Sequence, residues 1–101
     1  MDVKHKVERL RKLCNDNGIY CLSALATFCS LDEVTGVERL AKTLRQSSSC
    51  THQWIVMFEL FGLITREEAA RGRPRPMVLT PDGLALREAL DGLLSQILPA
   101  E

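Results

Sequence analysis

The sequence lacks a long hydrophobic run, an excess of either charge and the common catalytic motifs. None of its apolar stretches approaches the roughly 20 residues that cross a bilayer, and residues 1–12 are too highly charged for a secretory signal. Lys plus Arg and Asp plus Glu both total 13, so no overall field attracts nucleic acid or an anionic membrane. We therefore expect a cytoplasmic protein with no membrane partner, whose electrostatic contacts are made by local groups of residues.

Motifs for catalysis and metal binding are equally absent. The sequence contains no G-x-S-x-G elbow, no Gly-rich phosphate loop and no HExxH segment. His5 and His52 are far apart in the chain, which does not favour a metal site. These absences indicate a protein that is not an enzyme and that needs no metal and no cofactor.

The four cysteines form no CxxC pair, and a disulfide framework is not expected in a chain without a secretory signal. Cys14, Cys21 and Cys29 are separated by seven and eight residues, which is close to whole helical turns. This spacing favours small apolar side chains on one helix face. The alternative is a thiol redox sensor or an iron–sulfur site, which requires thiolates that converge in space.

The length fits one domain, residues 1–101, because independent domains usually contain about 100–150 residues. A content of 46% apolar and 26% charged residues is that of an ordinary folded domain. Hydrophobic periodicity and capping signals, among them a capping box from Thr35 to Glu38, predict five helices. The expected helices span residues 2–16, 19–30, 35–44, 47–61 and 81–98. Short strands are expected at 63–67 and 77–80, on either side of a basic Gly/Pro segment that suits a hairpin tip.

Residues 36–80 have the order of a winged helix-turn-helix: two short helices joined by a tight turn and followed by a hairpin. This segment carries seven cations and four anions, and Arg71, Arg73 and Arg75 lie close together in the hairpin. In such a fold the second helix enters the major groove of DNA, while the hairpin contacts phosphates or the minor groove. The predicted fold class is therefore mainly α with a small β-hairpin.

Several motifs between residues 40 and 83 are those of a known family. They are Leu40-Ala41, Leu44, Ser49, Phe58-Glu59, Gly62-Leu63-Ile64, Arg66 and Leu79-Thr80-Pro81-Asp82-Gly83. With these motifs the chain resembles the MarR-type (multiple antibiotic resistance regulator) winged-helix repressors and, more loosely, the PadR-type regulators. The resemblance implies a DNA-binding surface made of groove-facing side chains and wing arginines. Its candidate residues are Ser48, Ser49, Thr51, His52, Gln53, Arg71, Arg73 and Arg75.

The first and last helices carry apolar seams at intervals of three and four residues. We expect these helices, residues 1–16 and 81–98, to join two copies across a two-fold axis. The two recognition helices would then lie about 34 Å apart, or a multiple of that, on a pseudo-palindromic operator. No residue pattern identifies a small-molecule effector.

The leading hypothesis is thus a homodimeric repressor that binds double-stranded DNA in a sequence-specific way. One alternative is a winged-helix protein-interaction module that uses Val56, Met57, Leu60 and Phe61 and does not bind DNA. Another alternative is a thiol- or iron–sulfur-sensing form of the regulator.

Overall fold

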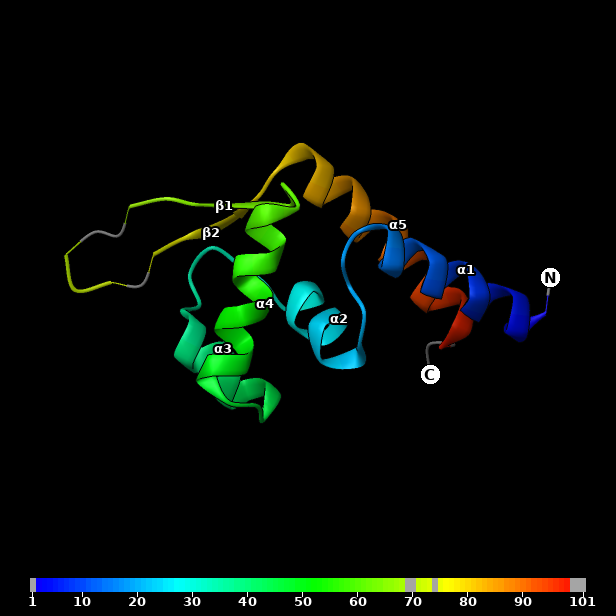
Figure 1. Cartoon of the computed structure of the whole chain (residues 1–101), viewed down its shortest axis with the longest axis horizontal. Helices are drawn as coiled ribbons and strands as arrows, with labels where there is room; N and C mark the ends of the chain where they lie inside the picture. The colour runs from blue at the N-terminus through cyan, green and yellow to red at the C-terminus, as the bar shows by residue number, and fades with distance from the viewer. Residues whose placement is uncertain (1, 69–70, 74, 99–101) are drawn as a thin grey trace.

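The computed structural model describes residues 2–68, 71–73 and 75–98, and it arranges them as five helices and one two-stranded hairpin (Figure 1). The helices are α1 (Val3–Asp16), α2 (Leu22–Cys29), α3 (Val37–Leu44), α4 (Ser48–Leu60) and α5 (Pro81–Ile97). Strands β1 (Ile64–Arg66) and β2 (Met77–Leu79) pair antiparallel, with Thr65 opposite Val78. The prediction of a mainly helical fold with a small hairpin is confirmed.

Three helices begin where short polar side chains cap them. Asp2, Ser47 and Thr80 precede α1, α4 and α5, and each accepts a hydrogen bond from the backbone amide three residues further on, at 2.8 to 3.0 Å. Such a bond satisfies one of the amides that the first turn of a helix leaves without a partner. The predicted starts of the recognition helix and of the last helix are therefore confirmed.

The predicted capping box at the start of α3 is wrong. The N-cap residue is Gly36, and no side chain caps the helix. The hydroxyl of Thr35 instead donates to the carboxylate of Asp32 at 2.8 Å, and the Thr35 amide donates to the same carboxylate at 2.6 Å. Thr35 therefore lies one residue before the N-cap, and its side chain bonds back to Asp32.

The second helix is shorter than the predicted span of residues 19–30. Gly18 adopts a positive φ of 77°, and the Ile19 amide donates to the Cys14 carbonyl at 2.8 Å, so the chain closes the end of α1 and turns. Ile19 is buried directly after this turn. Ile19, which the sequence predicted as the first residue of the second helix, therefore lies before that helix and anchors the connection between α1 and α2.

The main core lies between α2, α3, α4, the hairpin and the first half of α5. Phe28 of α2 and Phe58 of α4 meet edge to face, with ring centroids 5.2 Å apart. Other buried apolar members are Leu40, Ile55, Leu63, Ile64, Met77, Leu86 and Leu90. The start of α5 approaches the hairpin so closely that a Cβ on Gly83 would overlap the Leu63 carbonyl oxygen. This core holds α4 and the hairpin in one rigid arrangement.

Helix α1 and the second half of α5 lie side by side and extend away from this core, so the molecule measures 50 × 27 × 23 Å (Figure 1). We call α1 with residues 91–98 the arm, and the rest of the structure the body. Leu86 and Leu90, half of the seam predicted for a partner copy, are buried within this chain. Leu93 and Ile97 keep part of their surface exposed.

Candidate nucleic-acid interface

The outward face of α4 carries four of the predicted contact residues in its first half. Ser48, Ser49, His52 and Gln53 are all exposed. The turn before them is tight, because Arg45 adopts a left-handed conformation with φ of 55° and Ser47 already caps α4. Nothing in the described part of the chain covers this end of the helix.

Thr51 must be removed from the predicted contact set. Its side chain is 0% exposed, and its hydroxyl donates to the Ser47 carbonyl at 3.0 Å. The same hydroxyl accepts a hydrogen bond from the Gln46 side chain at 2.8 Å. Thr51 therefore belongs to the inner side of α4, which packs against the core.

Gln46, in the turn between α3 and α4, was not identified from the sequence. Its amide nitrogen donates to Thr27 of α2 at 2.9 Å and to Thr51 of α4. Its amide oxygen accepts from the Ser23 hydroxyl at 2.8 Å, and Ser23 also accepts from the Trp54 indole nitrogen at 3.0 Å. These five residues, the Gln46 network, tie α4 to α2. Because their polar groups are paired inside the protein, they favour one orientation of α4.

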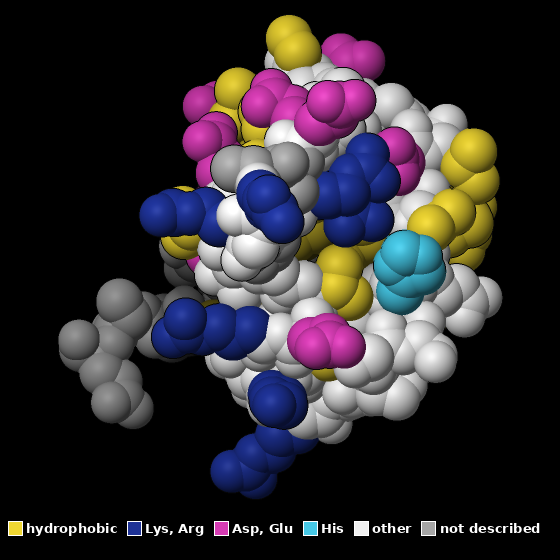
Figure 2. Space-filling view, turned by 90° about the vertical axis from the view of Figure 1, so that its left-hand side faces the viewer, with side chains coloured by type: hydrophobic (Ala, Val, Ile, Leu, Met, Phe, Trp, Pro, Cys, Tyr) yellow, Lys and Arg dark blue, Asp and Glu magenta, His cyan; other side chains and the backbone are white. Residues whose placement is uncertain are grey.

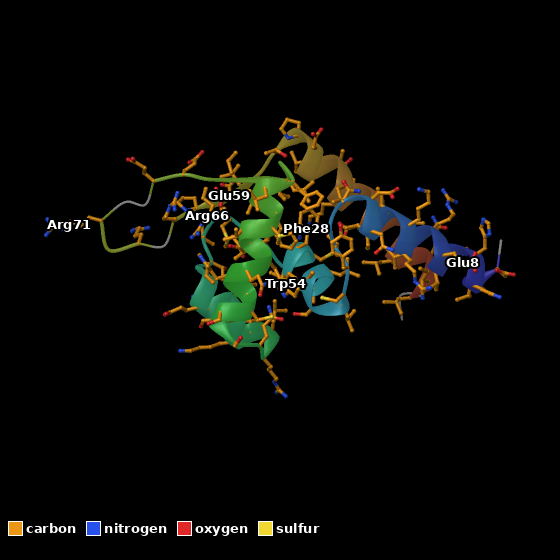
Figure 3. The ribbon with its side chains drawn as sticks, in the orientation of Figure 1. Glu8, Phe28, Trp54, Glu59, Arg66 and Arg71 are labelled. Atoms are coloured by element: carbon orange, nitrogen blue, oxygen red, sulfur yellow. The ribbon has the colours of Figure 1, made fainter. Side chains whose placement is uncertain are left out.

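The arginines of the wing fall into two groups. Arg71 and Arg73 are exposed, and Figure 3 shows Arg71 at the far end of the hairpin. The Arg75 guanidinium instead turns back on the hairpin, donating to the Glu67 carbonyl at 3.3 Å and to the Arg66 carbonyl at 3.2 Å. Arg75, although it is also exposed, therefore braces the base of the wing, whereas Arg71 and Arg73 lie further out along the hairpin. Residues 69, 70 and 74 of the predicted tip lie outside the described part of the chain.

A pocket of about 750 Å³ lies between the base of the wing and the beginning of α3. Figure 2 shows this side of the molecule, where Lys and Arg side chains spread over the middle and lower parts and Asp and Glu gather mainly at the upper edge. The pocket is lined by Val34, Gly36, Val37, Glu38, Arg39, Lys42, Arg66 and Arg75. Four cationic side chains thus surround a space that contains a single carboxylate.

The second half of α4 presents a different surface. Val56 is 38% exposed and Leu60 is 76% exposed, and with His52 they follow one another at intervals of four residues on one face. Glu59 is exposed beside them. The outward face of α4 therefore changes from polar to apolar along its length.

The cysteines do not share one apolar face, contrary to the prediction. Cys14 is buried, Cys29 is half-buried and Cys21 is exposed at the N-cap of α2; all four cysteines are free thiols. Burial raises the pKa of the Cys14 thiol, and burial followed by the nearby Asp91 charge raises the pKa of Cys29. A raised pKa disfavours the reactive thiolate. Within the described ranges, no group of three or more His, Cys, Asp or Glu side chains is placed to hold a metal ion.

None of the helices in the described ranges is both long enough and apolar enough to span a membrane.

Two solved structures share this architecture. One is described as the transcriptional regulator PA3341, with a TM-score of 0.69, 17% identity and coverage of 93% of this chain and 71% of that chain. The other is AbfR in a disulfide-formed state, with a TM-score of 0.70, 21% identity and coverage of 96% of this chain and 68% of that chain. No protein-family model matches the sequence, and no curated protein matches it.

Likenesses at these identities show the fold and not the function. The winged helix-turn-helix prediction is therefore confirmed, with α3 and α4 as the two helices and β1 and β2 as the wing. The narrower resemblance to MarR-type repressors stays an interpretation of the motifs in residues 40–83.

Proposed function

We propose that this protein is a transcriptional regulator that binds double-stranded DNA in a sequence-specific way, as a homodimeric repressor. The observation that carries the proposal is the uncovered polar end of α4 beside an arginine-bearing wing. The shared fold with a protein described as a transcriptional regulator supports the same reading.

The exposed groups on α4 suit the edges of base pairs. Gln53 can pair bidentately with adenine, and the hydroxyls of Ser48 and Ser49 can donate to or accept from bases and phosphates. The Gln46 network limits the rotation of α4, so little orientational freedom is lost on binding. Arg71 and Arg73 would add phosphate or minor-groove contacts from the wing.

The arm supports the homodimer. Its outer ends leave large apolar side chains in water, with Val3 59% exposed and Leu98 66% exposed. Leu10, Leu13 and Ile97 are only partly covered by this chain. Burying these groups against a second copy would remove that surface from water and would set the spacing of the two recognition helices.

The test begins with selection of bound duplexes from random oligonucleotides by the full-length chain. Recovery of a repeated half-site supports sequence-specific binding by a dimer. Titration of the selected duplex at several salt concentrations should then show a steep loss of affinity as salt rises. Each neutralised phosphate contributes about −0.9 to the slope of log affinity against log salt concentration. Arg73→Gln should weaken binding and reduce the slope, whereas Arg11→Gln on α1 removes the same charge and should change neither. Salt-independent binding, or no enrichment of any sequence, would exclude the proposal.

A second candidate function is docking of a partner protein on the apolar part of α4. The observation that favours it is the exposure of Leu60 and, to a lesser degree, of Val56 and Phe61. Of these, Leu60 is the cleaner probe, because the Phe61 ring packs beside Gly18. If docking is the function, Leu60→Glu abolishes activity in cells while Arg71→Gln with Arg73→Gln has no effect. If the protein regulates transcription by binding DNA, the variant with Arg71→Gln and Arg73→Gln should instead lose activity.

A further inference from the structure

We propose that the pocket between the base of the wing and the start of α3 is a binding site for a phosphate-type oxyanion. The oxyanion would be a phosphate of the DNA backbone, and this part of the inference rests on the proposed function. A free phosphate would use the same chemistry, and the experiments below distinguish the two sources.

The first observation is the charge of the lining. Arg39 and Lys42 come from α3, and Arg66 and Arg75 come from the hairpin, while Glu38 is the single acidic lining residue. Among the described residues, none of these four cations forms an ion pair; Arg39 acts only at longer range, helping to lower the pKa of Asp32. The lining of the pocket therefore carries more positive charge than its single carboxylate offsets.

The second observation is an unpaired donor inside the lining. The Nε atom of Arg66 is buried from solvent and has no hydrogen-bond partner. A buried donor without a partner is unfavourable, and more so when it is charged. The other arginine of the wing base, Arg75, places its own donors on the carbonyls of Glu67 and Arg66. An oxyanion in the pocket would place acceptor oxygens beside the Arg66 side chain, whose Nε has no partner within the protein.

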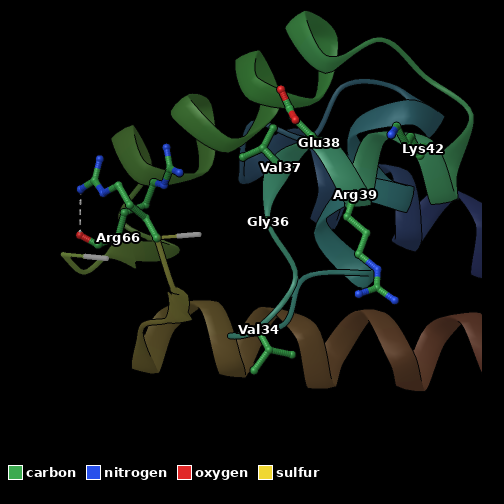
Figure 4. A pocket seen from close by; sticks show the side chains of 8 residues that line it. Val34, Gly36, Val37, Glu38, Arg39, Lys42 and Arg66 are labelled. Atoms are coloured by element: carbon green, nitrogen blue, oxygen red, sulfur yellow. Dashed lines mark hydrogen bonds between the residues drawn. The ribbon is translucent and has the colours of Figure 1, made fainter. Parts of the chain in front are cut away.

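The third observation is the first turn of α3, which lines the pocket at Gly36, Val37 and Glu38. Because the N-cap is glycine, no side-chain oxygen accepts from the first amides of this eight-residue helix. These amides and the helix dipole favour an anion in the same space. Figure 4 shows Arg66 at one end of the pocket and Arg39 at the other, with the start of α3 between them. Cations at both ends suit a phosphodiester segment that crosses the pocket.

The binding test uses the full-length chain and inorganic phosphate. Nitrogen-15 NMR should show saturable shifts of the Arg66 Nε–H signal and of the amides of residues 37–39, compared with chloride at equal ionic strength. Lys42→Gln, at an exposed side chain, should weaken the response at least threefold while leaving the rest of the spectrum unchanged. Arg11→Gln removes an exposed charge on α1, outside the pocket, and should leave the response intact. Shifts that never saturate, or that are the same in Lys42→Gln, would overturn the site.

The source of the oxyanion is tested with duplex DNA. If a backbone phosphate occupies the pocket, Lys42→Gln reduces the slope of log affinity against log salt by about 0.9. A saturable phosphate response with an unchanged slope supports the same site with a free oxyanion as its occupant. Absence of DNA binding by the unaltered protein would contradict the proposed function, while the phosphate titration would still decide the site.

Discussion

The body and the arm of this protein are stabilised in different ways. In the body, α2, α3 and α4 bury an aromatic pair, and the Gln46 network pairs the polar groups between them. In the arm, α1 and the end of α5 cover only one side of each other and leave Val3 and Leu98 exposed. The body buries its apolar core within one chain, whereas the arm leaves apolar side chains exposed that the proposed second copy would cover. This contrast agrees with the proposed division between a DNA-binding body and an arm that joins two copies.

The largest effect is expected from breaking the core of the body. Phe58→Ala removes a buried ring that meets Phe28, so the free energy of unfolding should fall by about 3–5 kcal/mol. Urea denaturation followed by Trp54 fluorescence measures the loss. Val56→Ala, on the exposed side of the same helix, is the matched control and should change stability by no more than about 0.5 kcal/mol. Equal losses in the two variants would mean that α4 is not oriented as described.

The next effect is expected from the Gln46 network. Gln46→Ala leaves Thr27, Thr51 and Ser23 without their shared partner, which should lower the free energy of unfolding by about 1–3 kcal/mol. Gln53→Ala deletes the same side chain at an exposed position and should leave stability nearly unchanged. DNA affinity separates the two roles: the Gln46 variant should lose affinity by misorienting α4, and the Gln53 variant by losing a base contact. Wild-type stability in Gln46→Ala would show that the network does not hold α4.

For the arm, the expected effect depends on protein concentration. If two copies join through it, tenfold dilution should lower the apparent free energy of unfolding by about 1.4 kcal/mol per dimer. Val3→Glu with Leu98→Glu places charges in the proposed interface and should yield a monomer by sedimentation. Leu60→Glu changes an equally exposed apolar residue in the body and should leave the dimer intact. A monomeric wild-type protein at micromolar concentration would contradict the assignment of the arm.

The smallest effect is expected where the arm meets the body, at Cys14 and Cys29. Because their pKa values are raised in the folded state, their contribution to stability is fully present below the ordinary thiol pKa of 9.0. It is lost as the pH rises above that value, since the unfolded thiols ionise first. Unfolding measured between pH 7 and pH 10 should show this decline, and Cys14→Ala should reduce it.

At pH 7.5 the exposed Cys21 should react with a disulfide reagent well before Cys14. Equal reaction rates would contradict the burial described.

Local sequence signals predicted the fold well where they depended on near neighbours. Ser47 and Thr80 cap helices through amides three residues away, so their role is visible in the sequence itself. Thr35 is not the cap because the helix begins one residue later, with Gly36 at the N-cap, and the Thr35 side chain bonds back to Asp32 instead. The spacing of Leu86 and Leu90 suggested a partner copy, but these side chains fill the core of their own chain. Apolar residues at helical spacing predict that one face of a helix is buried. They do not predict whether the same chain or a second copy covers that face.

Two parts of the candidate site depended on long-range contacts. Thr51 looked like an exposed polar residue near a helix start, yet Gln46 supplies the hydrogen bond that allows its burial. The pocket cations at positions 39 and 66 are far apart in the chain and line one space only after the hairpin has folded beside α3. Sequence patterns relate residues that are a few positions apart, so they do not predict contacts between residues this far apart in the chain.

The sequence by itself determined the order of helices and strands, the caps of α4 and α5, and the exposed polar end of α4, because hydrophobic periodicity and capping act over a few residues. The tertiary structure alone decided the Gln46 network, the turning back of Arg75 and the cationic pocket. These features depend on donors and acceptors that meet only when distant segments pack together, since a buried polar group must find its partner wherever the fold places one.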